Sequence, residues 1–425
     1  MFGAPEVGGK SAIYPLILLV SVLLSACGFN KSGVVYPELL ENTGWKSIPE
    51  TLQAPGFAGY VSAIRSEVSE ARVPFVPGNE ADEVQFASPV EFQPDAECES
   101  TRGVAVLVHG LSDSAFSMRD IAKEITKACY IARTALLPGH GTKPGDLLST
   151  RLSDWTDTVQ YLIEQASQDH EHVVAFGFSL GSLLVMTEAL QPDSPVDALV
   201  TLSPAFYLTT SPWAEMSTWL YPMKTWLDKE KPDDTYRYEA IPTVAVAQTI
   251  KAKSRLHKSL TASDGISIPW MVVQSDDDLV IHASKNEKLF LQHAGNEASR
   301  LLTYYGQSAY AEAMESELDD PRLISLAAHS QDHQVSGLTH VAIHQSPQNH
   351  HYGIDGDYRN CGSGGPRSRT DVRECEEAVE LWLGPWDEKA PDEGPYGLST
   401  YNPHFAELSS HINQFLDDAW QQSRQ

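Results

Sequence analysis

The sequence predicts an α/β fold in which a doubly wound, mainly parallel sheet is covered by helices on both faces. Short apolar runs rich in β-branched residues recur along the chain, and segments with helical spacing separate them. This alternation is typical of buried parallel strands joined by helices. One long stretch in the middle and two polar stretches near the end break the alternation. They add an inserted cap and long C-terminal loop excursions to the predicted fold.

The elements follow from these patterns in chain order. The continuous apolar runs predict strands at 103–108, 130–137, 172–178, 196–202, 268–274 and 301–305. Helical spacing predicts helices at 117–128, 153–168, 180–190, 243–260 and 402–420. The last helix is amphipathic and closes the chain.

The same patterns divide the chain into segments. Residues 1–26 form a leader, and prolines predict an irregular arm at 28–83. The core comprises residues 84–205 and 266–425, and the aromatic- and Met-rich segment 206–265 has the size of a cap inserted between them. Two polar, Gly- and Pro-punctuated insertions in the second part of the core, near 306–335 and 345–400, are expected to lie on the surface.

Composition limits the possible functions. The chain has 425 residues, of which 42% are hydrophobic and 20% charged, so a sizeable folded core is expected. The formal net charge of −27 argues against nucleic acid as a partner, because binding it requires a basic face. It also argues against electrostatic docking on anionic lipid, and favours a well-solvated surface.

The N-terminus carries a targeting signal. Lys10 precedes an apolar run at 12–24, which is too short to span a bilayer and suits a secretory signal. The ending Leu24-Ser25-Ala26-Cys27 resembles the lipobox of bacterial lipoproteins, which implies that Cys27 is lipidated. Gly28 rather than aspartate follows, which in that family indicates the outer membrane, so we expect an envelope protein anchored there and facing the periplasm or the exterior. An ordinary signal peptide or a short anchor is the alternative.

The remaining cysteines fit an exported protein. Four are left, an even number for an oxidising compartment, and three pairings are possible. We favour Cys98 with Cys129, since each precedes a predicted strand, and Cys361 with Cys375, since they bracket a Gly/Arg-rich loop. Free buried thiols are the alternative.

A nucleophile motif lies between a predicted strand and a predicted helix. Gly177-Phe178-Ser179-Leu180-Gly181 fits the pattern G-x-S-x-G, in which the serine occupies a strained turn and the glycines let the two backbones pass closely. Acyl transfer also needs two backbone N–H donors for the oxyanion. Leu180 supplies one, and Leu111, after the turn His109-Gly110, supplies the other. We interpret His109 as structural.

Several motifs in a fixed order now identify a family. His109-Gly110 is followed by Leu137-Pro138-Gly139-His140-Gly141, by Asp154-Trp155 and by the Ser179 motif. Tyr238-Glu239-Ala240-Ile241-Pro242 and the run 274–281 come later. This order resembles the carboxylesterase and monoacylglycerol-lipase branch of the α/β-hydrolases over about residues 85–290 and the last helix. The resemblance implies the α/β-hydrolase fold and a Ser–acid–His triad.

The family pattern also selects the acid and the base. In the run Asp276-Asp277-Asp278, the family spacing selects Asp278, with Asp276 as the competitor; a solvated turn or weak calcium ligation is the structural alternative. Among six histidines at 329–351, only His340 stands in the family form Gly-x-x-His followed by an aliphatic residue. Asp278 and His340 are 62 residues apart, about twice the family's usual distance. We attribute the excess to an acidic insertion at 306–335, after a last strand at 301–305.

The same histidines do not form a recognised metal motif, and neither H-E-x-x-H nor a Cys/His ligand spacing is present. We expect no metal or other cofactor, and surface histidines instead.

The sequence therefore predicts a serine hydrolase that cleaves carboxylic esters, with acylglycerol- or lipid-like substrates favoured by the proposed membrane anchor. A same-fold acyltransferase or peptidase is one alternative. A non-catalytic envelope lipoprotein that uses the scaffold for binding is another. A dehalogenase is disfavoured, because its elbow needs a carboxylate where Ser179 stands.

Overall fold

The computed structural model describes most of the chain, and its described residues lie within the unit Val34–Gln425. The described ranges are 37–44, 55–76, 78–209, 224–227, 229, 233–306, 309–310, 320–361, 369–385 and 395–424. The leader, the proposed lipidation site Cys27 and the cap residues 210–223 lie outside them. No helix within these ranges is long and apolar enough to cross a membrane.

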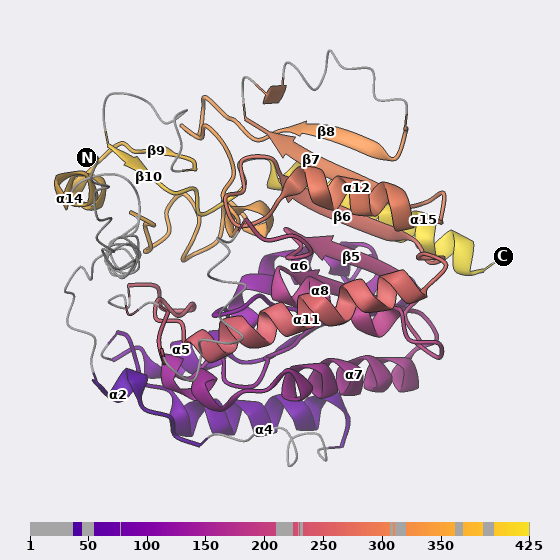
Figure 1. Ribbon diagram of the computed structural model, residues 1–425, viewed down its shortest axis with the longest axis horizontal. Coiled ribbons are helices and arrows are strands. Elements are labelled where there is room, and N and C mark those ends of the chain that lie inside the picture. The colour runs from indigo at the N-terminus through magenta and orange to yellow at the C-terminus, as the bar shows by residue number, and fades with distance from the viewer. Residues whose placement is uncertain are drawn as a thin grey trace, which may run out of the picture. The chain divides into compact units, whose positions relative to one another are not determined.

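An eight-stranded sheet forms the centre of this unit (Figure 1). Its strand order is β1-β3-β2-β4-β5-β6-β7-β8, and only β1 pairs antiparallel. The doubly wound, mainly parallel sheet predicted from the sequence is confirmed. The strands are β1 (Glu91–Phe92), β2 (Gly103–Val108), β3 (Tyr130–Thr134), β4 (Val173–Phe178), β5 (Ala198–Leu202), β6 (Trp270–Ser275), β7 (Arg300–Tyr305) and β8 (Leu323–Ala327).

Helices cover both faces of the sheet, as Figure 1 shows. Alternate residues of β2 point to opposite sides: Val104 and Val106 join one hydrophobic cluster, and Ala105 and Leu107 join the other. The first cluster includes side chains from α4 (Gly56–Ala71), α7 (Leu152–Asp169), α8 (Leu180–Ala189), α11 (Thr243–Ala262) and α12 (Ala283–His293). The second includes side chains from α6 (Arg119–Lys127) and α15 (Phe405–Ser423).

Shorter elements complete the described part of the chain. They include the helices α2 (Pro37–Leu40), α5 (Glu80–Ala87) and α14 (Arg369–Glu377) and the 3-10 turns η1 (Ala115–Met118), η2 (Pro144–Ser149) and η3 (Ala342–His344). Strands β9 (Trp382–Leu383) and β10 (Tyr396–Gly397) pair in a small separate sheet.

The N-terminal arm is less irregular than the sequence predicts. Helix α4 spans 16 residues between Pro55, which occupies its N-cap position, and Pro74. Its buried residues, spaced by three or four positions, are Phe57, Tyr60, Ile64 and Val68. The prolines therefore bound a helix instead of preventing one, and the prediction of an irregular arm is wrong for this segment.

The C-terminal part differs from the prediction as well. Strand β8 pairs parallel with β7, so the sheet continues beyond the predicted last strand at 301–305. His340 follows β8, and the long separation from Asp278 includes this extra strand, not only a surface insertion. In addition, several residues after 344 are buried, among them Gln345, Asn349 and His351, so this stretch is not a surface excursion.

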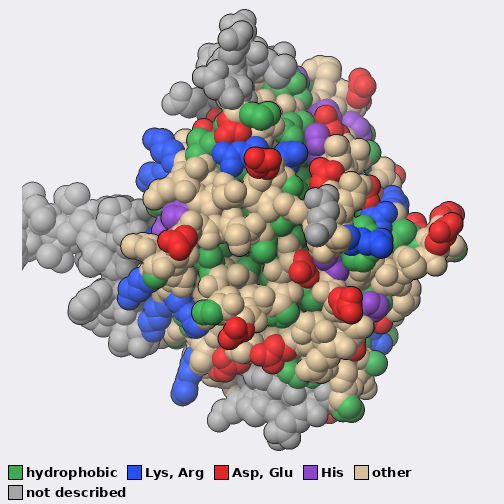
Figure 2. Space-filling view, turned by 90° about the vertical axis from the view of Figure 1, so that its right-hand side faces the viewer, with side chains coloured by type: hydrophobic (Ala, Val, Ile, Leu, Met, Phe, Trp, Pro, Cys, Tyr) green, Lys and Arg blue, Asp and Glu red, His purple; other side chains and the backbone are tan. Residues whose placement is uncertain are grey.

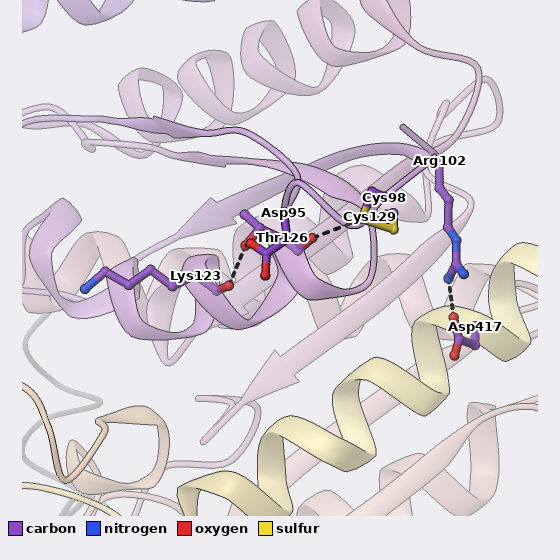
Figure 3. The surroundings of a disulfide bond; sticks show 7 residues. All are labelled: Asp95, Cys98, Arg102, Lys123, Thr126, Cys129 and Asp417. Carbon is purple, nitrogen blue, oxygen red and sulfur yellow. Dashed lines mark hydrogen bonds and ion pairs between the residues drawn. A yellow bond between two sulfur atoms is a disulfide. The ribbon is translucent and has the colours of Figure 1, made fainter. Parts of the chain in front are cut away.

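Both favoured disulfides are present, so the predicted pairing is confirmed. Cys98–Cys129 joins the segments that precede β2 and β3 (Figure 3). Cys361–Cys375 links the end of the buried stretch to α14. Closing loops of these lengths stabilises a fold by about 3 kcal/mol each in the chain-entropy model.

Charged side chains are interspersed on the face drawn in Figure 2, where basic groups stand between acidic ones.

Candidate active site

The nucleophile motif forms a sharp turn between β4 and α8. Ser179 has φ 51° and ψ −111°, a strained conformation for a residue with a side chain. A Cβ on Gly177 would lie 2.5 Å from the backbone of Gly181, and one on Gly181 would lie 2.2 Å from the carbonyl oxygen of Val108. Only glycine fits at either position, which explains the spacing of the motif. Ser179 itself remains half-buried.

The three predicted triad residues meet at this turn. His340 Nε2 lies 2.9 Å from Ser179 Oγ, and His340 Nδ1 lies 2.7 Å from Asp278 Oδ2. Because the carboxylate fixes a proton on Nδ1, Nε2 is left as the acceptor for the serine hydroxyl. The structure thus arranges the three groups in the order that general-base activation of a serine requires.

Burial and backbone hydrogen bonds distinguish Asp278 from Asp276 in the run of three aspartates. The Asp278 side chain is fully buried, and its Oδ1 accepts hydrogen bonds from the amides of Val280 (2.8 Å) and Ile281 (3.3 Å). These bonds hold the carboxylate in place beside His340. Asp276, the competing candidate, is exposed. The geometry therefore favours Asp278 over Asp276.

A glycine brings the histidine loop against the acid loop. Gly337, three residues before His340, packs so closely on Asp277 that a Cβ would lie 2.5 Å from Asp277 Oδ2. Since Asp277 is the neighbour of Asp278, this close approach places the two loops side by side. The glycine of the Gly-x-x-His form thus has a steric reason in this fold.

The other histidines occupy different environments. His344 is buried with its ring 4.2 Å from that of Phe178, and burial lowers the pKa of His344 to about 3. His351 is also buried and bonds to Asp234, away from the serine. The expectation of surface histidines is wrong for these two. Within the described ranges, no group of three His, Cys, Asp or Glu side chains is arranged to hold a metal ion.

The amides of Leu111 and Leu180 are the predicted oxyanion donors. Gly110 lies against the nucleophile, since a Cβ there would be 3.2 Å from Ser179 Cβ, and Leu180 is the first residue of α8. Neither amide donates a hydrogen bond to another described residue. Both are therefore free, as far as the described chain extends, to bind an oxyanion formed at Ser179.

His109 orients the first of these amides. Its Nε2 accepts a hydrogen bond from the Leu137 amide (3.0 Å), so the ring proton is on Nδ1, which donates to the Gly110 carbonyl (2.7 Å). In a trans peptide the Gly110 C=O and the Leu111 N–H point in opposite directions, so fixing the carbonyl also fixes the N–H. Burial lowers the pKa of His109 to about 4, which keeps the ring neutral near pH 7. These contacts are those of a structural residue, as we interpreted it.

The residue after Leu111 is strained and held from two sides. Ser112 has φ 68°, and its amide donates to His140 Nε2 (3.2 Å). Its carbonyl accepts a hydrogen bond from the Tyr238 amide (2.8 Å), and the Tyr238 ring is nearly parallel to that of His140. Tyr238 belongs to the cap segment, so the cap contributes directly to the shape of the oxyanion loop.

Asp113 is a buried acid that the sequence reading missed. Burial raises its pKa to about 7, against the opposing charge of Arg237. A small cavity is lined by both residues, by Val341 and Tyr352, and by Phe178, which precedes Ser179. Another groove, of about 1000 Å³, lies between α4 and α5 and has no triad residue in its lining. Trp213, Trp219 and Tyr221 of the aromatic- and Met-rich cap segment lie outside the described ranges.

Known proteins resemble this chain over about half of its length. Residues 99–308, about half of the chain, match the Hydrolase_4 family, described as serine aminopeptidase, S33. A thermostable monoacylglycerol lipase of Bacillus sp. (strain H-257) is 28% identical over 191 residues, which are 44% of this chain and 74% of that protein. The family match at 99–308 contains Ser179 and Asp278 and ends before His340.

The chain also resembles solved structures over about half of its length. A soluble variant of monoglyceride lipase from Saccharomyces cerevisiae, in complex with a substrate analog, has a TM-score of 0.46 and 12% identity and covers 52% of this chain and 82% of that chain. The monoacylglycerol lipase of Paleococcus ferrophilus has a TM-score of 0.43 and 21% identity, and the match covers 51% of this chain and 88% of that chain.

Proposed function

The chain belongs to the α/β-hydrolase family of serine hydrolases, and from this premise we propose that it cleaves carboxylic esters of lipid-like substrates, acylglycerols among them. The observation that carries the proposal is the hydrogen-bonded series from Ser179 through His340 to the buried carboxylate of Asp278. The oxyanion loop beside it supplies the second requirement of acyl transfer.

The reaction proceeds in two halves. His340 Nε2 takes the hydroxyl proton as Ser179 Oγ attacks the ester carbonyl, and the oxyanion binds the amides of Leu111 and Leu180. The intermediate collapses to an acyl-enzyme, and His340 gives its proton to the leaving alcohol. Water then attacks the acyl-enzyme by the same route. The Asp278 carboxylate orients His340 and stabilises the imidazolium in both halves.

The lipid-like substrate class is supported by the matched relative, which is named as a monoacylglycerol lipase. We expect kcat/KM on p-nitrophenyl esters to rise with acyl length from acetate to octanoate and monoacylglycerol to be hydrolysed, because each buried methylene adds about 0.8 kcal/mol. Aminoacyl arylamides and added alcohol acceptors test the peptidase and acyltransferase alternatives in the same assay. Faster cleavage of arylamides than of any ester, or acyl transfer in excess of hydrolysis, would contradict the proposal.

We further propose that Cys27 carries a lipid anchor and that the protein resides in a bacterial envelope, at the outer membrane. The support is the Leu24-Ser25-Ala26-Cys27 ending of a short apolar run. In a Gram-negative host, Cys27→Ala should move the protein from the membrane pellet to the soluble or unprocessed fraction, and labelling with a palmitate analogue should be lost. Ser25→Thr is a control that leaves the cysteine in place. A Cys27→Ala variant that is still labelled and pelleted would exclude the anchor.

A further inference from the structure

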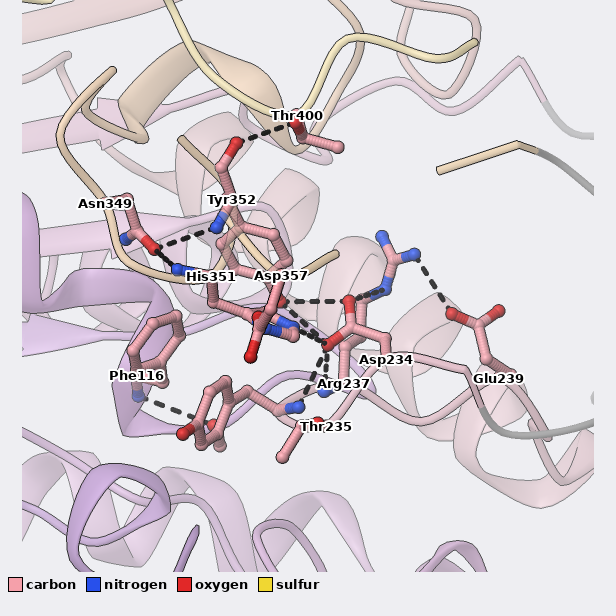
Figure 4. A network of polar contacts seen from close by, with 12 residues as sticks. Phe116, Asp234, Thr235, Arg237, Glu239, Asn349, His351, Tyr352, Asp357 and Thr400 are labelled. Atoms are coloured by element: carbon pink, nitrogen blue, oxygen red, sulfur yellow. Dashed lines mark hydrogen bonds and ion pairs between the residues drawn. The ribbon is translucent and has the colours of Figure 1, made fainter. Parts of the chain in front are cut away.

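A buried carboxylate in the cap segment connects two distant parts of the chain. The Asp234 side chain is fully buried, and it accepts hydrogen bonds from His351 Nε2 (3.1 Å) and from the Tyr352 hydroxyl (3.0 Å) (Figure 4). It also accepts hydrogen bonds from the amides of Tyr236 (2.9 Å) and Arg237 (3.2 Å), two and three residues further along. One carboxylate thus shapes the cap turn and attaches it to the C-terminal part of the chain.

The charges at this junction strengthen the attachment. Burial alone would raise the pKa of Asp234, but the hydrogen bond from His351 and the charge of Arg237 lower it. Burial opposes a charge on His351, but its hydrogen bonds to Asp234 and Asp357 raise its pKa. Removing one partner of such a buried pair strongly destabilises the fold, because the charge of the other partner is left uncompensated.

The C-terminal side of the junction is itself fixed. Asn349 Oδ1 accepts hydrogen bonds from the amides of His351 and Tyr352, both 2.9 Å, and Asn349 Nδ2 donates to Asp120 of α6 (2.7 Å). Thr400 Oγ1 donates to the carbonyl oxygen of Tyr352 (2.7 Å), as Figure 4 also shows. His351 and Tyr352, which hold Asp234, therefore belong to a segment that is hydrogen-bonded to α6.

The cap side leads to the oxyanion loop within four residues. The Tyr236 ring stacks on Phe116 with ring centres 4.0 Å apart, and the Tyr238 amide donates to the strained Ser112. A residue in this part of conformational space stores about 1–3 kcal/mol and persists only where its surroundings hold it. If the cap turn moves, Ser112 loses the partner of its carbonyl, and the loop that carries the Leu111 amide loses one of the contacts that hold it in place.

We propose that Asp234, held by His351 and Tyr352, is a positioning residue for the oxyanion loop of the serine hydrolase. The proposal rests on the function proposed above. The C-terminal stretch then sets the geometry of a donor that stabilises the transition state, through the cap turn, without touching the substrate. Such a residue affects kcat and leaves KM almost unchanged, because the oxyanion exists only after attack.

The test compares Asp234→Asn with Asp357→Asn. Asp357 bonds the other ring nitrogen of His351 but its side chain is 74% exposed, and it makes no hydrogen bond to the described cap residues 233–240. On p-nitrophenyl butyrate we expect Asp234→Asn to lower kcat about tenfold and to leave KM within about twofold of wild type. The loss of kcat is smaller than the roughly 10²–10³-fold loss that follows removal of a whole oxyanion donor. A trifluoromethyl ketone, whose hemiketal oxyanion uses the same donors, should bind about tenfold more weakly. Asp357→Asn should stay within about twofold of wild type in all three quantities.

A milder variant keeps the test decisive if Asp234→Asn does not fold. Tyr352→Phe removes one hydroxyl from Asp234 and keeps the ring, and we expect about a threefold loss of kcat and of ketone affinity. The proposal would be overturned if kcat per active site and ketone affinity of Asp234→Asn stayed within about twofold of those of Asp357→Asn. If Asp234→Asn does not fold, the same criterion applies to Tyr352→Phe. A folded wild type that hydrolyses no ester would instead refute the proposed function, and ketone binding would still report on the loop.

Discussion

Replacing Ser179 with alanine is expected to lower ester hydrolysis about 10⁶-fold, to the level of background, and to abolish labelling by a fluorophosphonate probe. The hydroxyl lies 2.9 Å from His340 Nε2 at a turn where Gly177 and Gly181 leave no room for another side chain. Alanine removes the attacking oxygen and fits the same backbone, so the loss is chemical and not structural. Rates on p-nitrophenyl butyrate and mass spectrometry of the labelled protein measure it.

Ser182→Ala is the matched control for this variant. Ser182 lies in the first turn of the same helix, is buried, and donates to the carbonyl oxygen of Gly177 (2.7 Å). Its loss should lower stability by about 1 kcal/mol and leave labelling intact. Labelling that persists in Ser179→Ala would place the nucleophile elsewhere. A folded wild type that is never labelled would favour a binding protein built on the same scaffold.

Replacing His340 with alanine is expected to lower kcat by about 10⁵-fold or more, because the serine hydroxyl loses its base and Asp278 has no imidazolium to stabilise. Deacylation should fail as well, since the same ring activates water. Stopped-flow assays with p-nitrophenyl butyrate measure the rate, and added imidazole should restore part of it, because the variant leaves a cavity next to Ser179.

His344→Gln controls for the removal of a nearby histidine. Its ring contacts Phe178 and is held neutral by burial, so its replacement should lower the melting temperature and leave kcat per folded molecule within about threefold. If His344→Gln removes activity while His340→Ala retains it, the base is wrongly assigned.

Local patterns predicted the elements that carry the nucleophile. The apolar run before Ser179, its two glycines and the helix after it all follow from residues adjacent in sequence. Local patterns alone did not identify Asp278 and His340. Each was chosen from several candidates by the residue spacing of the family that the sequence resembles. The structure adds the physical reasons: Asp276 is exposed, and Gly337 packs on Asp277.

Sequence patterns could not predict contacts between residues that are far apart along the chain. Asp234 and His351 are 117 positions apart, and neither lies in a motif, so no local signal connects them. Strand β8 was missed because its five residues follow an acidic stretch and are only partly buried. Helix α4 was missed because prolines were read as interruptions, whereas they bound the helix at both ends. In each case tertiary contacts, not local preference, decide the structure.

The order in which the site is synthesised has a consequence for the living cell. The strand and helix around Ser179 are complete before the midpoint of the chain, but His340 comes late, and α15, which fills one face of the core, is the last helix. A chain that has emerged only as far as residue 308 has the serine and the acid without the base. We therefore expect a nascent chain of that length to be inactive toward esters, because it lacks the base of the proposed triad.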